Sequence, residues 1–274
     1  MKADLHNHSY YSDGVLSPSE VVKLASEAEC DLFSLTDHDT TDGIAEAQQE
    51  ADKLNLNLIN GVEISAFWRN MAIHILGLGI DINNDILQTG LEHNQKLRKE
   101  RAEKIALGLW RSGIKDALEK TQSFSKTDML TRTHFAQMLI SEGYCKDMKS
   151  VFRRYLTGKK PGGVRVEWED FDEVIHWIHA AGGKAFIAHP FRYRMTHTKI
   201  KTMFNDFKCG MGDGIEVVTG TSSDEEIQLG SQWAGKYNLL ATCGSDFHGW
   251  PNQRIRIGNL RDLPDPKKAV WRHL

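Results

Sequence analysis

The 274-residue sequence predicts an α/β protein with a helical insertion in its middle. Short apolar runs alternate with helical patterns at both ends of the chain, and repeated βα units of this kind form a parallel sheet, open or closed into a barrel. Between residues 84 and 165 the alternation stops, and helical stretches such as Leu91–Leu109 follow one another with almost no strand signal. We therefore expect a body made of residues 1–83 and 166–274, and a helical insertion over residues 84–165 that covers the functional site.

The first element signals lie near the N-terminus. Ser17 precedes Pro18 and is followed three residues later by Glu20, a pattern typical of a helix start with a capping box. We expect this helix to continue to about Glu29. The other elements expected before the insertion are short strands at Ala3–Leu5, Leu32–Leu35, Leu58–Ile59 and Ala72–Leu78, and a helix near Asp42–Leu54.

After the insertion the alternation resumes. Asp170 is expected to cap a helix that ends near Gly182 and Gly183, because Asp is a favoured N-cap residue and Gly often follows a helix end. The remaining elements expected are strands at Lys184–Ala188, Gly214–Val218 and Leu239–Thr242, and a helix that begins near Ser223.

The composition excludes several protein classes. Hydrophobic residues make up 40% and charged residues 26% of the chain, values that exclude intrinsic disorder. No apolar run approaches the ~18 residues of a membrane span, and the first residues lack the apolar stretch of a signal peptide. The four cysteines are far apart and form no Cys-x-x-Cys pair, which favours neither a disulfide framework nor a thiolate zinc site. We expect a cytoplasmic protein with no membrane contact and no obligate protein partner.

The charge is unevenly distributed. Residues 84–165 hold 17 Lys and Arg against 9 Asp and Glu, a net charge of +8, whereas the remaining residues carry −11. Glu92 with Lys96, and Glu100 with Lys104, have the i,i+4 spacing of surface ion pairs on a helix. These pairs explain part of the charge but not the excess of cations in the insertion.

Histidines and carboxylates gather at the ends of the expected strands. In βα proteins the carboxyl ends of the strands form the functional face, so these side chains are expected to converge. Imidazole and carboxylate together are the ligand set for Zn, Mn or Fe, and burying so many titratable groups without cations is costly. The histidines in question are His6, His8, His38, His74, His189 and His248.

The segments around these residues resemble the PHP (polymerase and histidinol phosphatase) phosphoesterases. The similar motifs, in order, are Asp-x-His-x-His-Ser-x-x-Ser-Asp-Gly at 4–14, Thr-Asp-His-Asp at 36–39, Gly-Val-Glu-Ile-Ser at 61–65, Ala-His-Pro at 188–190 and Gly-Ser-Asp-Phe-His at 244–248. The resemblance implies a distorted (β/α)7 barrel. The insertion is similar to that of the tryptophan-operon-linked branch, which includes nucleoside 3′,5′-bisphosphate phosphatases and a 5′→3′ exoribonuclease acting on short RNA.

The resemblance also implies a ligand set for two to three divalent metal ions, preferably Mn, with Zn, Fe or Mg as alternatives. Glu63 is expected to bridge two of the ions. At the third site Asp13 occupies a position that is histidine in other branches, and aspartate is still a competent oxygen ligand. The implied sets are His6, His8, Glu63 and Asp246 for the first ion, Glu63, His74 and His189 for the second, and Asp13, His38 and His248 for the third.

Four further residues are candidates for substrate contact. Arg192 follows the Ala-His-Pro motif closely, and Arg132, His134 and Lys160 lie in segments of the insertion that resemble the same branch. Arg192, Arg132 and Lys160 are expected to hold phosphate groups, and Arg192 and His134 are the expected catalytic residues. His134 has a suitable pKa to protonate the departing ribose oxygen. Asp37 and Asp39 flank His38; either could orient a ligand as a hydrogen-bond acceptor, and Asp39 is interpreted as the start of the following helix.

The function that the resemblance implies is metal-dependent hydrolysis of the 3′-phosphoester of a 5′-phosphorylated nucleotide. The substrates would be short 5′-monophosphate RNA, degraded from its 5′ end, or a nucleoside 3′,5′-bisphosphate. The −11 body argues against a long nonspecific nucleic-acid footprint. The alternatives are a histidinol-phosphate phosphatase or general phosphomonoesterase, a C–N hydrolase of the amidohydrolase type, and a non-catalytic metal-binding accessory module.

Overall fold

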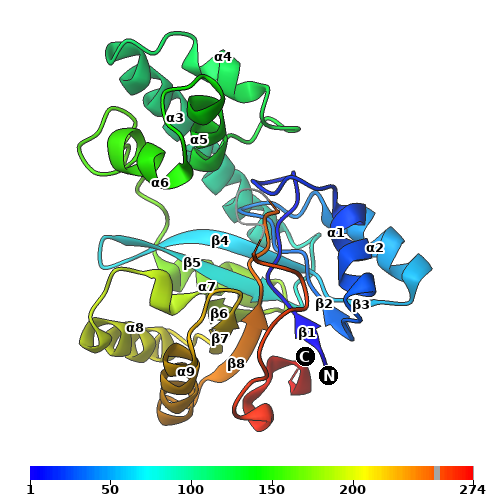
Figure 1. Ribbon diagram of the computed structural model, residues 1–274. Helices are drawn as coiled ribbons and strands as arrows, with labels where there is room; N and C mark the ends of the chain where they lie inside the picture. The colour runs from blue at the N-terminus through cyan, green and yellow to red at the C-terminus, as the bar shows by residue number, and fades with distance from the viewer. Residues whose placement is uncertain (250–253, 274) are drawn as a thin grey trace.

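The computed structural model describes residues 1–249 and 254–273 and has a mixed α/β body with a helical lobe on one side of it (Figure 1). The described strands are β1 (Ala3–Asp4), β2 (Leu32–Phe33), β3 (Asn57–Leu58), β4 (Gly61–Trp68), β5 (Met71–Leu78), β6 (Lys184–Ile187), β7 (Gly214–Thr219) and β8 (Leu240–Gly244). The described α-helices are α1 (Pro18–Glu27), α2 (Ile44–Leu54), α3 (Asp85–Arg111), α4 (Ala117–Gln122), α5 (Arg132–Ser141), α6 (Met148–Val151), α7 (Phe171–Ala180), α8 (His197–Cys209) and α9 (Asp224–Lys236). Short turns of other helix types are η1 (Phe152–Leu156, a π-helix), η2 (Pro190–Arg192), η3 (Pro266–Lys268) and η4 (Val270–Arg272).

The strands form two sheets. One is parallel with the order β1-β2-β3, and the other has the order β4-β5-β6-β7-β8. In the second sheet β5 pairs antiparallel with both β4 and β6, while β6, β7 and β8 are parallel. The α/β class is confirmed, but the expectation of parallel strands alone is wrong at β5.

A tight hairpin is the reason for the antiparallel pairing. Arg69 and Asn70 join β4 to β5, and both have positive φ, 45° and 64°, as two-residue hairpin turns of type I′ require. This turn lacks the Asn-Gly or Asp-Gly signature by which such hairpins are usually found in a sequence. Without that signature, β4 was not among the strands expected from the sequence.

The two sheets approach each other at both sides of the body. The Leu5 N–H donates to the Cys243 carbonyl at 3.0 Å, which joins the end of β1 to β8. The Glu63 N–H donates to the Asp37 carbonyl at 3.2 Å, which joins the segment after β2 to β4. A single closed sheet is not confirmed, but these contacts bring the segments with the predicted metal ligands together.

The predicted helix caps are largely confirmed. The Ser17 hydroxyl accepts the Glu20 N–H at 3.1 Å and the Glu20 carboxylate accepts the Ser17 N–H at 2.8 Å. The Asp170 carboxylate accepts the Asp172 N–H at the start of α7. Asp39 does not begin a helix, because α2 starts at Ile44, and Asp39 is buried with a φ of 52°. Among the described helices none is long and apolar enough to cross a membrane.

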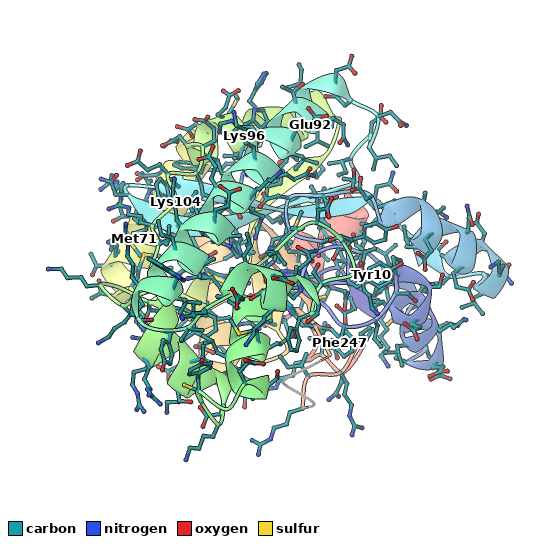
Figure 2. The ribbon with its side chains drawn as sticks, turned by 90° about the horizontal axis from the view of Figure 1, so that it is seen from above. Tyr10, Met71, Glu92, Lys96, Lys104 and Phe247 are labelled. Atoms are coloured by element: carbon teal, nitrogen blue, oxygen red, sulfur yellow. The ribbon has the colours of Figure 1, made fainter. Side chains whose placement is uncertain are left out.

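Helix α3 connects the body to the lobe. Its first turns, with Leu87 and Leu91, pack in the core of the body, whereas Ile105 and Leu109 pack in a separate core of the lobe. A Cβ on Gly108 would lie 1.8 Å from the Pro161 carbonyl, so only glycine allows this close approach of α3 and the lobe. In Figure 2, Glu92, Lys96 and Lys104 mark the middle part of α3. The Lys104–Glu100 ion pair forms at 3.6 Å, but no ion pair forms between Glu92 and Lys96.

Candidate active site

Glu63, on β4, is the centre of a buried cluster of histidines and carboxylates. Its two carboxylate oxygens are each close to several imidazole nitrogens, with distances from 2.8 Å (His38 Nδ1 and His74 Nδ1) to 3.4 Å (His6 Nε2). The histidines within this range of Glu63 are His6, His8, His38, His74 and His189.

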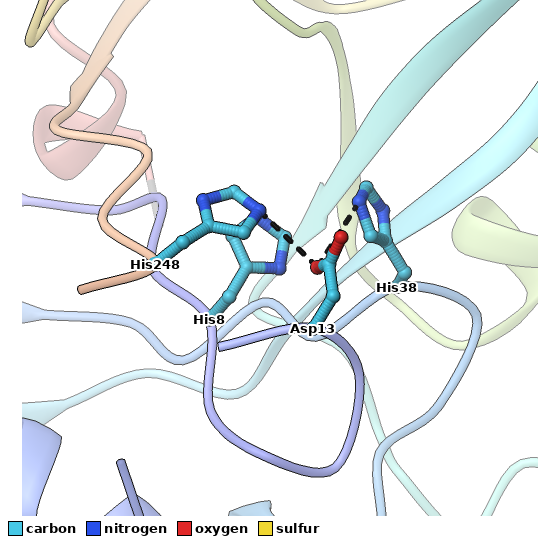
Figure 3. A group of neighbouring side chains, drawn as sticks. All are labelled: His8, Asp13, His38 and His248. Carbon is cyan, nitrogen blue, oxygen red and sulfur yellow. Dashed lines mark ion pairs between the residues drawn. The ribbon is translucent and has the colours of Figure 1, made fainter. Parts of the chain in front are cut away.

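Two more carboxylates complete the cluster. Asp246, which follows β8, has its Oδ1 3.1 Å from His8 Nε2 and 3.3 Å from His6 Nε2. Asp13 Oδ1 lies 3.2 Å from His248 Nε2 and 3.7 Å from His38 Nε2 (Figure 3). All nine residues that the sequence analysis proposed as metal ligands are thus brought together.

Eight of the nine residues form overlapping groups with ligand atoms within 4.8 Å of one another, and His189 belongs to none of these groups. The first group matches the predicted first set, but His8 also belongs to the group around Asp13, and its ring lies 4.1 Å from that of His248. His38, rather than His189, shares a group with Glu63 and His74. The groups are His6, His8, Glu63 and Asp246; His38, Glu63 and His74; and His8, Asp13, His38 and His248.

The cluster contains buried polar atoms that have no hydrogen-bond partner. Such atoms are rare and destabilising unless something else satisfies them. His38 Nδ1 and Glu63 Oε2 are only 2.8 Å apart, yet neither forms a hydrogen bond, as expected when both lone pairs face a common cation. The donor set therefore fits divalent metal ions. The unpartnered atoms in the cluster are His6 Nε2, Asp13 Oδ1, His38 Nδ1, Glu63 Oε2 and His189 Nδ1.

The electrostatics of the cluster keep its carboxylates ionised. Burial raises the pKa of Glu63, but the charges of His74 and His38 outweigh burial and hold this pKa well below its ordinary value. Burial also raises the pKa of Asp246, but the charges of His6 and His248 outweigh burial and hold this pKa well below its ordinary value. Ionised carboxylates are what a cation-binding site needs.

Glu216, on β7, is a site residue that the sequence analysis missed. It is fully buried, and its carboxylate lies 3.0 Å from His6 Nδ1 and accepts the His189 N–H at 2.7 Å. A carboxylate behind a metal-binding histidine fixes the tautomer that leaves the other ring nitrogen free for the metal. The signal in the sequence was a lone acidic residue inside the apolar run Gly214–Val218.

We expect Glu216→Gln to weaken Mn²⁺ binding about tenfold. Glutamine has nearly the shape of glutamate but lacks the negative charge that makes His6 a better ligand. Calorimetric titration of metal-free protein with Mn²⁺ measures this change. Glu50→Gln is the matched control, since Glu50 is also a buried carboxylate but lies in α2 beside Lys53. Equal Mn²⁺ affinities in Glu216→Gln and wild type would contradict this role.

The two aspartates that flank His38 hold neighbouring segments in place. Asp37 accepts hydrogen bonds from the Ser9 N–H and from the Ser9 and Ser12 hydroxyls, which fixes the loop between His8 and Asp13. Asp39 accepts hydrogen bonds from Ser65 on β4 and from Asn94 and Arg98 on α3. Asp39 therefore ties the lobe helix to the strand that carries Glu63.

A cavity of about 400 Å³ lies between the cluster and the lobe. Asp13, His38 and His74 form the end of its wall nearest the cluster, and Phe67, Phe152 and Trp168 add aromatic surface. Four arginines line the same cavity: Arg98, Arg101, Arg132 and Arg165.

Arg101 is the most unusual of these arginines. Its side chain is only 8% exposed and forms neither a hydrogen bond nor an ion pair with the part of the chain that the structure describes. Its guanidinium lies over the Trp168 ring at 5.4 Å. Burial lowers the pKa of Arg101 well below its ordinary value, and the charges of Arg98 and Arg132 lower it further against the opposing charges of Asp39 and Asp13. A guanidinium that lines a cavity without a hydrogen-bond acceptor from the described residues is suited to bind an anion.

Sequence analysis did not single out Arg98 and Arg101. Arg98 and Arg101 occupy buried positions on the face of α3 that also carries Leu91, Asn94 and Ile105. Charged residues at core positions of an amphipathic helix were the signal that could have found them.

The four predicted substrate residues lie in different surroundings. Arg132 lines the cavity with its guanidinium 5.7 Å from the Phe152 ring. Arg192 lies at the edge of the cluster, where it pairs with Asp246 and donates to the Thr221 hydroxyl. Lys160 is exposed on a turn of the lobe and is not part of the cavity wall, so the structure does not bring it to the site.

His134 is 2% exposed near the start of α5. Its Nδ1 accepts the Thr131 N–H at 3.2 Å, which completes a capping box. Burial lowers the pKa of His134 below its ordinary value, which favours the neutral ring. Its neighbour Thr133 donates its hydroxyl to Asp13 at 2.8 Å, which joins the lobe to the cluster.

Several known proteins are similar to this chain over almost its whole length. A 3',5'-nucleoside bisphosphate phosphatase of Chromobacterium violaceum is 40% identical over 272 residues, which cover 99% of this chain and 95% of that protein. A 5'-3' exoribonuclease of Haemophilus influenzae is 39% identical over 273 residues, covering 98% of both chains. The 5'-3' exoribonuclease Rnm of Escherichia coli is 39% identical over 270 residues, covering 98% of this chain and 92% of that protein.

Two solved structures are also similar. One, described as an amidohydrolase from Chromobacterium violaceum with bound sulfate and no metal, has a TM-score of 0.94 at 40% identity and covers 100% of this chain and 95% of its own. The other, a candidate metal-dependent phosphoesterase from Bifidobacterium adolescentis, has a TM-score of 0.83 at 25% identity and covers 97% and 93%. The family model of the PHP domain matches residues 4–208, a range that contains seven of the nine clustered residues. The chain belongs to the PHP domain family.

Proposed function

We propose that this protein is a metal-dependent phosphoesterase that hydrolyses the 3′-phosphoester of 5′-phosphorylated nucleotides. The substrates are nucleoside 3′,5′-bisphosphates and short RNA with a 5′-monophosphate. The observation that carries the proposal is Arg101, a buried guanidinium without an acceptor in a cavity whose other end is the metal-binding cluster. A substrate with two phosphate groups satisfies both ends at once. The relatives named above as a bisphosphate phosphatase and exoribonucleases support this choice.

The cluster is proposed to hold two to three divalent ions, preferably Mn²⁺. The ligands of the first are His6, His8, Glu63 and Asp246, those of the second Glu63, His74 and His189, and those of the third Asp13, His38 and His248. His38 Nδ1 also faces Glu63 at 2.8 Å, so with the other tautomer His38 would instead serve the ion held by Glu63 and His74. When bound, such ions neutralise charge on phosphoryl oxygens and lower the pKa of a coordinated water.

The rest of the chemistry is assigned to side chains of the chain. Arg101 and Arg132 hold the non-reacting 5′-phosphate, and the binding energy of that phosphate positions the ester to be cleaved. Trp168 and Phe152 lie beneath these guanidiniums and keep water away from them. Arg192 pairs with Asp246 at the edge of the cluster. With the Asp246 carboxylate coordinating a cation, the Arg192 guanidinium would be free to donate to a phosphoryl oxygen.

The finer architecture is also part of the proposal. The contacts between β1 and β8, and between the segment after β2 and β4, support a distorted barrel of the (β/α)7 type. Residues 84–165 are proposed as an insertion domain, supported by the separate hydrophobic core around Ile105 and Leu109. In this arrangement the insertion forms the wall of the cavity opposite the cluster.

The alternatives fit the cavity less well. Histidinol phosphate has one phosphate and a cationic amine, and that amine would face the arginines. A C–N hydrolase would not need a buried guanidinium, and the amidohydrolase relative holds sulfate, a tetrahedral anion like phosphate. A non-catalytic module would not need to retain all nine clustered ligands.

The test is to offer the Mn²⁺-loaded protein three substrates side by side. These are adenosine 3′,5′-bisphosphate, histidinol phosphate, and a short RNA with a 5′-phosphate. The proposal expects the first and third to be hydrolysed with a kcat/KM at least about 100-fold above that of histidinol phosphate, since two anchored phosphates add charged hydrogen bonds. A preference for histidinol phosphate, or equal hydrolysis of simple monoesters, would replace it with one of the alternatives.

His134→Gln tests the predicted catalytic role of His134, because glutamine at this position can retain the capping box. A proton donor in the reaction is worth at least about 100-fold in kcat. We expect a decrease below about fivefold with unchanged pH dependence, because burial favours the neutral ring and its Nδ1 caps α5. A 100-fold loss of kcat at an unchanged melting temperature would instead establish proton transfer by His134.

A further inference from the structure

The outer surface of the lobe carries a dense group of cations. Between residues 146 and 160 six side chains are basic and only Asp147 is acidic. All six basic residues are exposed. We call this group the lobe patch; it consists of Lys146, Lys149, Arg153, Arg154, Lys159 and Lys160.

No acidic side chain in the described parts of the chain pairs with the lobe patch. Asp147 is used as the N-cap of α6, where its carboxylate accepts the Ser150 N–H at 2.7 Å. Arg154 donates to the Tyr144 carbonyl, a neutral acceptor. Elsewhere in the lobe, Lys104 pairs with Glu100 and Lys120 pairs with Glu142. With Asp147 counted, the segment keeps a net charge of +5, and such a surface attracts polyanions.

The lobe patch borders the arginine-lined cavity. Phe152, the first residue of η1, lines the cavity, and the exposed Arg153 and Arg154 follow it directly. The next turn folds back onto η1, because the Gly162 N–H donates to the Tyr155 carbonyl at 2.7 Å, and it carries Lys159 and Lys160. The chain then returns to the cavity wall at Val164 and Arg165. Four of the six patch residues are thus carried by a segment anchored in the cavity wall at both ends, and Lys146 and Lys149 precede it.

We propose that the lobe patch binds the part of an RNA substrate that lies 3′ of the bond being hydrolysed. This inference rests on the proposed function, in which the 5′-terminal nucleotide occupies the cavity. Each additional nucleotide adds a phosphate that the cavity arginines do not reach. Single-stranded nucleic acids are held by cationic surfaces that follow their backbone, and the patch is such a surface next to the cavity. A nucleoside bisphosphate is too short to contact it.

The consequence is that the patch separates the two substrate classes. RNA gains affinity from the patch in proportion to the number of phosphates that reach it, and this gain decreases with salt. A bisphosphate gains nothing from the patch. Removing charge from the patch should weaken RNA binding and leave bisphosphate hydrolysis unchanged.

The test uses a triple variant, Lys149→Gln with Arg153→Gln and Lys159→Gln, in the full-length protein. The control triple, Lys104→Gln with Arg111→Gln and Lys115→Gln, removes the same charge from exposed positions of α3 and the turn after it. Affinity is measured for a 5′-phosphorylated RNA of about ten nucleotides, on EDTA-treated protein so that it is not cleaved, across a salt series. Hydrolysis of adenosine 3′,5′-bisphosphate is measured on Mn²⁺-loaded protein.

We expect the patch variant to bind RNA about tenfold more weakly at low salt. The slope of log K against log salt becomes shallower by about 2, because three contacts contribute about 0.7 each. Its kcat/KM for the bisphosphate stays within about twofold of wild type, and the control triple binds RNA within about threefold of wild type. Unchanged RNA binding, or an equal loss in the control triple, would overturn the proposal. RNA binding is measured on protein that cannot hydrolyse the RNA. Failure of the proposed reaction would therefore leave the difference in RNA binding between the two triple variants unchanged, and the two failures can be told apart.

Discussion

Glu63→Gln should abolish hydrolysis and remove metal from two sites at once. Glu63 faces five histidines, and its two oxygens are each shared between different ring nitrogens. Glutamine offers a single neutral acceptor oxygen. Its N–H₂ group has no lone pair for a metal ion, so it cannot replace the second carboxylate oxygen as a ligand. We expect kcat/KM to fall at least about 1,000-fold, which corresponds to about 4 kcal/mol of transition-state stabilisation.

The metal content gives the sharper readout. Wild-type protein prepared with excess Mn²⁺ is expected to carry two to three ions per chain, and Glu63→Gln to carry at most one. Elemental analysis after gel filtration measures both. Glu216→Gln serves as the comparison, since it should lower affinity while keeping the number of sites. One ion or none in the wild type would contradict the cluster proposal.

The second large effect is the dependence on a 5′-phosphate. We expect wild-type protein to hydrolyse 5′-phosphorylated RNA at least about 100-fold faster, in kcat/KM, than the same RNA with a 5′-hydroxyl. Arg101→Met should reduce this preference by about 1–3 kcal/mol, the contribution of a charged hydrogen bond, and Arg132→Ala should act in the same direction. Arg111→Ala, which changes an exposed arginine of the same helix, should leave the preference unchanged.

Arg101→Met should also stabilise the substrate-free protein. A buried charge without a partner costs free energy in the folded state, and a methionine of similar length removes that cost. An increase of about 1 kcal/mol corresponds to about 2–4 °C in melting temperature. Equal rates on 5′-hydroxyl and 5′-phosphate RNA in the wild type would contradict the phosphate-anchored proposal and leave a general phosphomonoesterase as the better description. A lower melting temperature would show that Arg101 already has a stabilising partner.

Sequence alone was sufficient for the cluster. His6 and His8, or Asp246 and His248, are separated by one residue at a strand end, and an extended backbone turns such side chains to the same side. The structure brings together the nine residues that the motifs indicated, although their division among ions depends on side-chain distances. His38 and His8 each lie between two groups, which no motif could reveal.

Other features depended on partners far away in the chain. Glu216 is 210 residues from His6, and its role exists only because β7 lies behind the histidine. Asp39 was interpreted as a helix start because local patterns describe only neighbouring residues. In the folded protein its partner is Arg98 on the lobe helix.

The sequence by itself determined the α/β class and the identity of the clustered residues, because these depend on composition, periodicity and short motifs. Only the tertiary structure decided which cations face the cluster. Arg101 lines the cavity and Lys160 lies on an outer turn, although both are basic residues of the same insertion. Charge is a property of a residue, but the burial that leaves a guanidinium without an acceptor is a property of how the lobe packs against the body.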